Sequence, residues 1–195
     1  LVDLHFRWGR ELVRSYTNEP PLPPRKSTRT PGKLRIGLLS SDLRRHSVAN
    51  FVLPIVKHYD RSQFEIHCFA PYAVAGDPVQ EQIISLVDGF HVLYNKTDRE
   101  AALAIQEMEI DVLLELNGFT RDTMVKSLRF KPAPVQVYWL GYPFTTGLPE
   151  MDYILVDPYF KPEREDWLIE KPLEMPEAWV CFDTLREETI CDEIP

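Results

Sequence analysis

The stretch LRIGLLSSDLRRHSVANFVLPIVKHYDRSQFEIHCF, residues 34–69, decides the fold. Its apolar start at 34–40 is typical of a buried strand. The apolar segment at 48–59 predicts a helix, in which Pro54 has to kink the helix or lie in its first turn. Residues 64–70 alternate and are rich in β-forming side chains, so they predict the next strand. Strand, helix and strand in this order indicate two parallel strands joined by a crossover helix.

The same alternation continues to residue 157. Further helices are expected at 78–87, 98–108 and 123–130, and further strands at 90–94, 111–118, 134–141 and 152–157. This order predicts an α/β fold, a Rossmann-like parallel sheet with helices on both faces. The acidic, proline-rich and aromatic residues that follow predict irregular peripheral structure, with Trp167, Trp179 and Phe182 as anchors.

The N-terminal part divides into a helix and a linker. Residues 1–17 predict a helix with Leu4, Trp8 and Leu12 on one stripe. No helix start precedes it, so we expect it to continue from an upstream region of a longer protein. Residues 18–32 are rich in proline and small polar residues, which predicts an extended linker. The main domain then comprises residues 33–195.

Composition excludes several classes of function. The 195 residues carry a net charge of −8, so a global basic surface for nucleic acid is absent. The three cysteines are widely spaced and form no zinc set, and the histidines show no metal-binding spacing, so no metal is expected. Without a recognisable signal peptide or an apolar run of membrane-spanning length, we expect a cytoplasmic protein. Dinucleotide and Walker A motifs are also absent, which argues against a dehydrogenase or a P-loop enzyme.

Three loops that follow predicted strands carry the candidate site residues. They are SSDLRRHS at 40–47, LNGFTRD at 116–122 and WLGYPFTTG at 139–147, and parallel strands should gather them at one edge of the sheet. His46 lies just before a helix N-terminus, where the helix dipole disfavours the imidazolium form. A neutral histidine there is a reasonable general base, and a histidine that only packs or caps in the turn is the alternative.

The other loop residues are suited to hold a ligand through hydroxyls and backbone N–H groups. Gly141 and Gly147 permit close approach of the backbone, Pro143 stiffens the loop, and Thr145 and Thr146 offer hydroxyls for a sugar or phosphate. In the second loop the corresponding residues are Asn117, Gly118 and Thr120. An ordinary turn explains each pattern equally well, and Asp42 has the same two interpretations, a ligand contact or a hydrogen bond to its own turn.

Taken together, three segments resemble the catalytic region of the O-GlcNAc transferase/SPINDLY family, in particular its bacterial members with tetratricopeptide repeats. The segments are 34–69, IDVLLELNGFTRD at 110–122 and KPAPVQVYWLGYPFTTGLPEMDYILVD at 131–157. They occur in the same order and with similar spacing as in the family. HFRWGREL at 5–12 resembles the helix that joins the repeats to the catalytic region.

The resemblance implies the N-terminal lobe of a two-lobed GT-B glycosyltransferase. Such an enzyme transfers a sugar from a nucleotide donor, UDP-GlcNAc in the best-known branch and GDP-fucose in plant SPINDLY, to Ser or Thr hydroxyls of proteins. It implies no metal and no cofactor. His46 matches a histidine considered as catalytic base or positioning group. Leu140, Gly141, Tyr142 and Pro143 match a loop beside the donor sugar.

The resemblance also sets the expected partners and the alternatives. The partners are a nucleotide sugar, a protein acceptor and the C-terminal lobe, without nucleic acid or membrane. That second lobe is absent from these residues, so this chain alone should be inactive. Ser47, Phe119 and Phe144 depart from the animal pattern, and a bulky Phe144 beside the sugar would affect the choice of donor. The alternatives are a non-catalytic repeat-linked module that binds protein or sugar, and a GT-B transferase with a non-protein acceptor.

Overall fold

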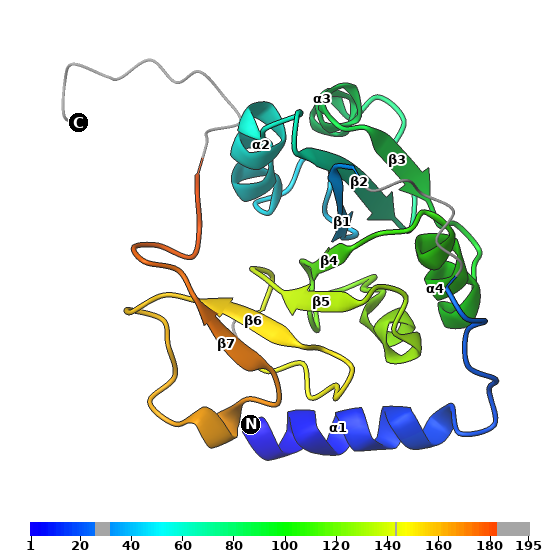
Figure 1. The fold of residues 1–195 in the computed structure, drawn as a ribbon, viewed down its shortest axis with the longest axis vertical. Helices are drawn as coiled ribbons and strands as arrows, with labels where there is room; N and C mark the ends of the chain where they lie inside the picture. Colours follow the sequence, from blue (N-terminus) through cyan, green and yellow to red (C-terminus); the bar gives the residue numbers. More distant parts are fainter. Residues whose placement is uncertain (26–31, 143, 183–195) are drawn as a thin grey trace.

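A parallel sheet forms the centre of the molecule (Figure 1). The computed structural model describes residues 1–25, 32–142 and 144–182. Within them seven strands pair in the order β3-β2-β1-β4-β5-β6-β7, and every pair is parallel. The strands are β1 (Leu34–Leu39), β2 (Phe64–Ala70), β3 (Gly89–Val92), β4 (Val112–Glu115), β5 (Val135–Tyr138), β6 (Tyr153–Val156) and β7 (Lys171–Glu174).

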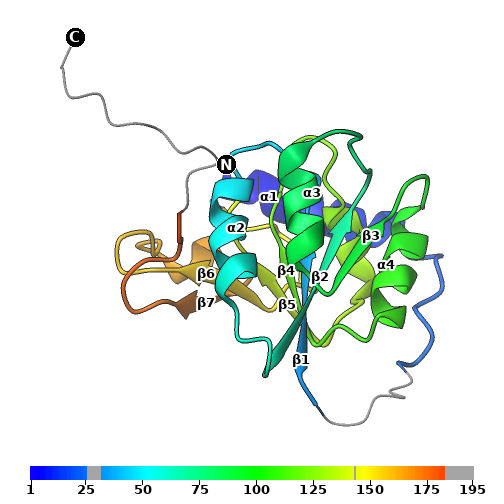
Figure 2. The same cartoon turned by 90° about the horizontal axis from the view of Figure 1, so that it is seen from above.

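Helices cover both faces of this sheet (Figures 1 and 2). The helical elements are α1 (Val2–Ser15), α2 (Ala49–His58), α3 (Pro78–Leu86), α4 (Asp98–Glu107) and the 3₁₀ helices η1 (Val125–Phe130) and η2 (Glu165–Trp167). The side chains of α2 and α3 share one apolar core, and those of α1, α4 and η1 share the other. The structure confirms the predicted Rossmann-like fold.

Successive side chains of the central strands point to opposite faces, so each strand contributes residues to both cores. Leu38 and Cys68 point into the α2–α3 core, whereas their neighbours Leu39 and Phe69 point into the core beneath α4. All four are buried, which explains why the carboxyl-terminal ends of β1 and β2 are apolar on both faces. Pro54 lies inside α2. In the described part of the chain, no helix is both long and apolar enough to cross a membrane.

Two predicted elements differ from the structure. The segment 123–130 is not an α-helix but the shorter 3₁₀ helix η1, which ends at Lys131 in the left-handed conformation. The region after residue 157 is not wholly irregular, because β7 extends the sheet beside β6. Proline is tolerated on an edge strand, so Pro172 does not prevent this pairing. The sequence KPLE is too short and too polar to have revealed a strand.

The predicted aromatic anchors have different fates. Trp179 is an anchor: its ring stacks on Phe160 with centroids 4.6 Å apart, and its carbonyl accepts a hydrogen bond from Trp139 Nε1 at 2.8 Å. Trp167 and Phe182 are exposed instead. Phe182 makes an edge contact with the ring of Phe51.

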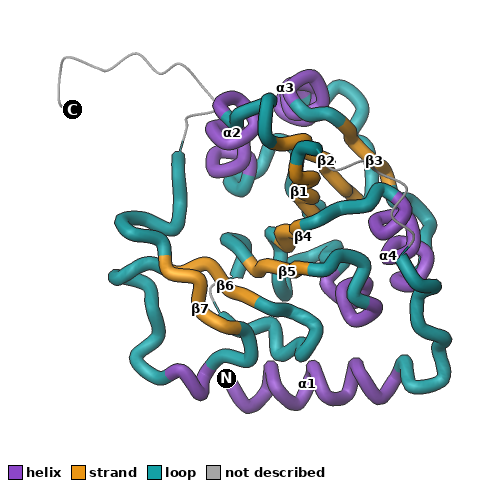
Figure 3. The backbone as a smooth tube through the Cα atoms, viewed as in Figure 1, coloured by secondary structure: helices purple, strands orange, loops and turns teal. Residues whose placement is uncertain are grey.

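Helix α1 packs directly against the lobe (Figure 3). Its buried residues are His5, Gly9 and Leu12, and Trp8 packs against the same core as Leu12. Leu4 is 56% exposed, so the predicted stripe of Leu4, Trp8 and Leu12 is wrong at Leu4. The contact is close because a Cβ on Gly9 would lie 1.7 Å from the Gly147 carbonyl oxygen. A sequence pattern that counts only large apolar residues overlooks a glycine contact face.

The described part of the proline-rich linker follows α4. Arg99 donates hydrogen bonds to the carbonyls of Pro20 and Pro21, and Gln106 donates to that of Pro23. The Tyr16 hydroxyl donates to Asp98 at the start of α4. The linker therefore holds α1 to the same body as the sheet.

Candidate functional site

The loops after β1, β4 and β5 meet at one edge of the sheet. β1 and β4 are neighbours although β2 and β3 separate them in sequence, so this edge is the topological switch point where open α/β sheets bind ligands. A cavity of about 310 Å³ opens there. Its lining residues are Asp42, His46, Ser47, Val48, Phe51, Thr120, Leu140, Gly141, Trp179 and Val180. Residues from all three predicted loops therefore line one cavity.

Asn117 ties the first two loops together. Its Oδ1 accepts from the Ser41 N–H at 2.8 Å, and its Nδ2 donates to Asp42 Oδ2 at 2.7 Å and to Thr120 Oγ1 at 3.0 Å. The side chain is buried, so each of these bonds replaces one to water. Asn117 therefore holds Asp42 and Thr120 at the cavity rather than lining it.

Glu115, at the end of β4, is a buried carboxyl group that the sequence did not single out. Its two oxygens accept from the N–H groups of Asn117 at 3.0 Å and Gly118 at 2.7 Å. Burial raises the pKa of Glu115 to about 7, against the lowering effect of these two bonds. The negative charge of nearby Asp42 adds to the rise. Glu115 thus fixes the start of the second loop through its backbone N–H groups.

Backbone geometry and close contacts explain why positions 118 and 141 are glycine. They also place Leu140 in an unfavourable backbone conformation. Gly118 has φ +61°, and a Cβ there would lie 2.2 Å from the Tyr138 hydroxyl. A Cβ on Gly141 would lie 2.0 Å from the Leu116 carbonyl oxygen. Leu140 has φ 90°, a conformation that costs energy for a residue with a Cβ. The second and third loops are therefore pressed together beside the cavity.

His46 lines the cavity with 39% of its side chain exposed. Its Nδ1 accepts a hydrogen bond from the Val48 N–H at 3.3 Å, and Asp42 Oδ2 lies 3.8 Å from the same nitrogen. When Nδ1 accepts, the proton of a neutral ring must be on Nε2. In this arrangement Nε2 is therefore a hydrogen-bond donor. His46 therefore packs in the turn and also lines the cavity, and its role as a general base stays a prediction.

Tyr142 lies next to the cavity lining but belongs to an aromatic cluster with α1. Its ring centroid is 5.9 Å from Phe119, 5.9 Å from Phe144 and 5.6 Å from His5. The Tyr138 hydroxyl holds Tyr142 through its backbone, accepting from its N–H at 2.8 Å. His5, a residue of α1, thus contacts the third loop. Pro143 lies outside the described residues.

Phe144 is absent from the lining of the His46 cavity. It lines a separate cavity of about 180 Å³ together with Ile154, Val156, Phe160 and other apolar residues. The sequence departure at Phe144 therefore contributes to packing behind the third loop. Phe119 likewise packs on α1, with its ring 4.7 Å from that of Trp8.

Thr145, Thr146 and Gly147 serve the fold rather than the cavity. The Thr145 hydroxyl donates to Glu170 Oε2 at 2.7 Å, and the Thr146 N–H donates to Oε1 at 2.7 Å. The Thr146 hydroxyl also donates to Glu170. The ligand role expected for these hydroxyls is not supported, because a buried carboxylate already binds them. Gly147, with φ +71°, lies against the His5 carbonyl of α1.

Sequence reasoning missed Glu170, Trp179 and Val180 as well as Glu115. Trp179 and Val180 come from beyond the predicted sheet, yet the chain returns to line the cavity. The Asp157 carboxylate positions them, since its Oδ2 accepts from the Trp179 N–H at 3.0 Å. In the sequence, the position of Asp157 directly after β6 was the feature that could have indicated this contact.

Known proteins match most of the chain. The sequence profile described as glycosyl transferase family 41 matches residues 11–186. A Hordeum vulgare protein named as a probable UDP-N-acetylglucosamine–peptide N-acetylglucosaminyltransferase SPINDLY is 28% identical over 93% of this chain. A Caenorhabditis elegans UDP-N-acetylglucosamine–peptide N-acetylglucosaminyltransferase is 33% identical over 77% of this chain.

A solved structure agrees with the sequence matches. A mutant of Thermobaculum terrenum O-GlcNAc transferase superposes with a TM-score of 0.79 and 27% identity over 92% of this chain. The chain spans 20% of the length of the barley relative, 13% of the nematode one and 34% of the solved chain. The matched region includes every element that forms the cavity and corresponds to the predicted lobe of the catalytic region. The chain belongs to glycosyl transferase family 41.

Proposed function

We propose that the full-length protein is a glycosyltransferase that moves GlcNAc from UDP-GlcNAc to Ser or Thr hydroxyls of proteins. The observation that carries this proposal is that the family match, over residues 11–186, includes the cavity at the switch point. The donor and the acceptor class come from the names of the relatives. This lobe would supply one wall of the active site, and a second lobe would hold most of the nucleotide.

In this proposal each site residue has a separate task. His46 contacts the reacting groups, since it is the ionisable side chain most exposed at the cavity mouth. Leu140 and Gly141 present backbone to the donor sugar, with Tyr142 and Pro143 completing that loop. Asn117 and Gly118 position the second loop, and Thr120 offers a hydroxyl at the cavity wall.

The reaction requires that the acceptor hydroxyl lose a proton as its oxygen bonds to the anomeric carbon. The bond between that carbon and the diphosphate breaks, and UDP leaves with the electron pair. For His46 Nε2 to take the proton, the ring proton must first be on Nδ1. Asp42 Oδ2, 3.8 Å from Nδ1, is an acceptor within reach of a small ring movement. Without that movement, His46 positions the substrates as a donor.

Intact-protein mass spectrometry tests the proposal. The full-length protein is incubated with acceptor proteins and a panel of UDP- and GDP-sugars, alongside His46→Ala. A mass gain of one GlcNAc with UDP-GlcNAc, lost in the variant, is the expected result. A gain with another donor would correct the sugar. No gain on protein, with sugar transferred to a glycan or small molecule, would replace the acceptor class.

Three further arms complete this experiment. Transfer should persist in EDTA, because the proposed reaction uses no metal or other cofactor. Residues 1–195 alone should transfer nothing, because the diphosphate would lack its second-lobe partners. Donor binding by the folded full-length protein without any transfer would instead support a non-catalytic binding module. A cytoplasmic location belongs to the same proposal and is tested by cell fractionation.

A further inference from the structure

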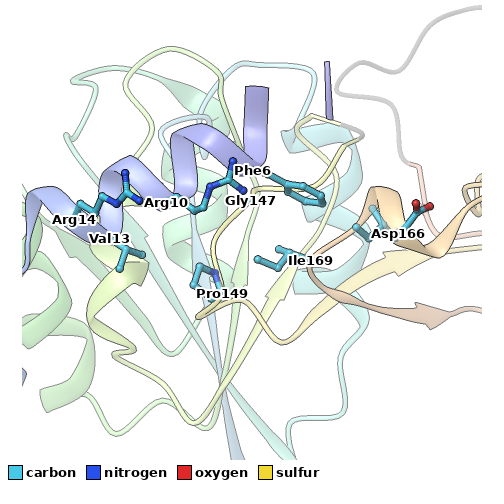
Figure 4. Close-up of a pocket in the computed structure, with 9 residues that line it drawn as sticks. Phe6, Arg10, Val13, Arg14, Gly147, Pro149, Asp166 and Ile169 are labelled. Atoms are coloured by element: carbon cyan, nitrogen blue, oxygen red, sulfur yellow. The ribbon is translucent and has the colours of Figure 1, made fainter. Parts of the chain in front are cut away.

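A groove of about 600 Å³ runs beside α1 (Figure 4). Helix α1 forms one wall, and the loop after β5 and the segment 166–169 form the rest. The lining residues are Phe6, Arg10, Val13, Arg14, Gly147, Pro149, Asp166, Leu168 and Ile169. None of these residues lines the His46 cavity. Its volume falls within the range of roughly 300–1,000 Å³ common for ligand pockets.

The groove combines an apolar floor with a cationic edge. Phe6, Val13 and Pro149 supply apolar surface, and Ile169 on the opposite wall is 41% exposed. Figure 4 shows Arg10 and Arg14 side by side along α1, as residues four apart on a helix must be. Apolar surface of this kind beside unpaired cations is typical of a surface that recognises a partner.

The charges of the groove do not cancel one another. Within the described part of the chain neither Arg10 nor Arg14 forms an ion pair, whereas Arg7 on the same helix lies 3.7 Å from Glu11. Asp166, at the far end, is already paired, because Arg164 Nε donates to its Oδ1 at 2.9 Å. The edge formed by α1 is therefore positive, although the 195 residues together carry −8.

We propose that this groove binds an extended polypeptide segment in which one apolar residue lies between two acidic residues. In an extended chain, side chains two residues apart lie on the same side at a spacing of about 6.6–7 Å. Arg10 and Arg14 are separated by about one helical turn, roughly 5.4–6 Å. Two carboxylates would thus face the two guanidiniums, and the side chain between them would face Leu168 and Ile169. This binding goes beyond sugar transfer and does not depend on it.

Fluorescence anisotropy with the full-length protein tests this proposal. The probe is the fluorescein-labelled peptide Gly-Ser-Glu-Leu-Glu-Ser-Gly. The comparison peptides replace both glutamates with glutamine, both with lysine, or the leucine with serine. The variants are the double substitution Arg10→Glu with Arg14→Glu, and Ile169→Asp on the apolar wall. Arg7→Glu is the matched control, because it changes charge on the same helix outside the groove.

We expect saturable binding of the Glu-Leu-Glu peptide that weakens at least about tenfold in the double variant and in Ile169→Asp. Arg7→Glu should change affinity less than about threefold. The double variant should instead prefer the lysine peptide, which shows that it remains folded. Equal binding of the glutamine peptide, equal loss in Arg7→Glu, or no saturable binding up to millimolar peptide would overturn the proposal.

Discussion

The loops after β4 and after β5 have similar sequences but different tasks. Both contain glycine, an aromatic residue and threonine directly after a buried strand. In the first, the Thr120 side chain lines the His46 cavity. In the second, Thr145 and Thr146 form hydrogen bonds with Glu170, and Gly147 packs against the backbone of α1. Only the start of the second loop, Leu140 and Gly141, reaches the cavity.

The difference arises from what each loop has as a neighbour. The loop after β4 lies next to the loop after β1 at the switch point, where strands leave an open crevice. The loop after β5 lies under α1 and beside the segment that leads into β7. Hydroxyls covered by other elements must find partners inside the protein, and a buried glutamate supplies them. Position in the sheet, and not loop composition, decides which hydroxyls remain available.

The largest expected effect is on transfer by His46→Ala. A group that moves or positions a proton typically contributes about 10²–10⁴ to the rate, so transfer should fall by that factor. The ring is 39% exposed, so thermal stability should hardly change. His58→Ala, at the exposed end of α2, is the matched control. The measurement is the initial rate of sugar transfer by the full-length protein, and a rate within threefold of wild type would remove His46 from the mechanism.

Gly9→Val tests the contact between α1 and the loop after β5. The new side chain would overlap the Gly147 carbonyl oxygen, so α1 must shift. Overpacking of this kind should lower the free energy of unfolding by about 3 kcal/mol. Urea denaturation measures the change. Leu4→Val on the exposed side of α1 carries the same β-branched cost, and it should lose less than about 0.5 kcal/mol. Equal losses would mean that α1 is not docked as described.

Glu115 should make stability depend on pH between about 4.5 and 7. Its pKa is about 7 in the folded protein and near 4.5 when unfolded. The unfolded chain therefore loses this proton first as pH rises, and the folded state is progressively destabilised up to pH 7. The full contribution is present below pH 4.5 and is lost above pH 7, on the order of 3 kcal/mol.

Glu115→Gln isolates this contribution. Urea denaturation at pH 5.0 and at pH 7.5 gives, for wild type and for the variant, the change in unfolding free energy between the two pH values. The loss of stability from pH 5.0 to 7.5 should be larger in wild type, because the glutamine side chain does not titrate. The stability of wild type relative to the variant should therefore fall as pH rises. Parallel pH profiles would show that Glu115 titrates normally in the folded state.

Thr120→Val and Thr146→Val test the two loops with one chemical change. Thr146→Val leaves a buried Glu170 oxygen with one donor fewer, which should cost about 1–3 kcal/mol of unfolding free energy. Thr120→Val, at a partly exposed position, should cost less than about 1 kcal/mol and reduce transfer instead. Thermal unfolding and initial transfer rates give both readouts. The reverse pattern would contradict the assignment of the cavity to the loop after β4.

The sequence predicted the gathering of residues better than their individual roles. Strand order and strand-end loops follow from period and composition, so His46, Thr120 and Gly141 were correctly expected at one edge. The buried glutamates that accept hydrogen bonds from the loops were not predictable in the same way. Glu115 looks like an ordinary strand residue, and Glu170 lies 24 residues from the threonine N–H that it binds. Long-range hydrogen bonds of this kind leave no periodic signal in a single sequence.

The smallest expected effect concerns Phe144, which the sequence placed beside the donor sugar. In the structure it lines the apolar cavity shared with Ile154 and Val156, and its ring lies 6.1 Å from that of His5. Phe144→Leu keeps an apolar side chain there and should cost less than about 1.5 kcal/mol. The ratio of transfer rates with UDP-GlcNAc and GDP-fucose should stay within twofold of wild type. A larger change in this ratio would mean that the loop after β5 moves Phe144 toward the sugar when donor binds.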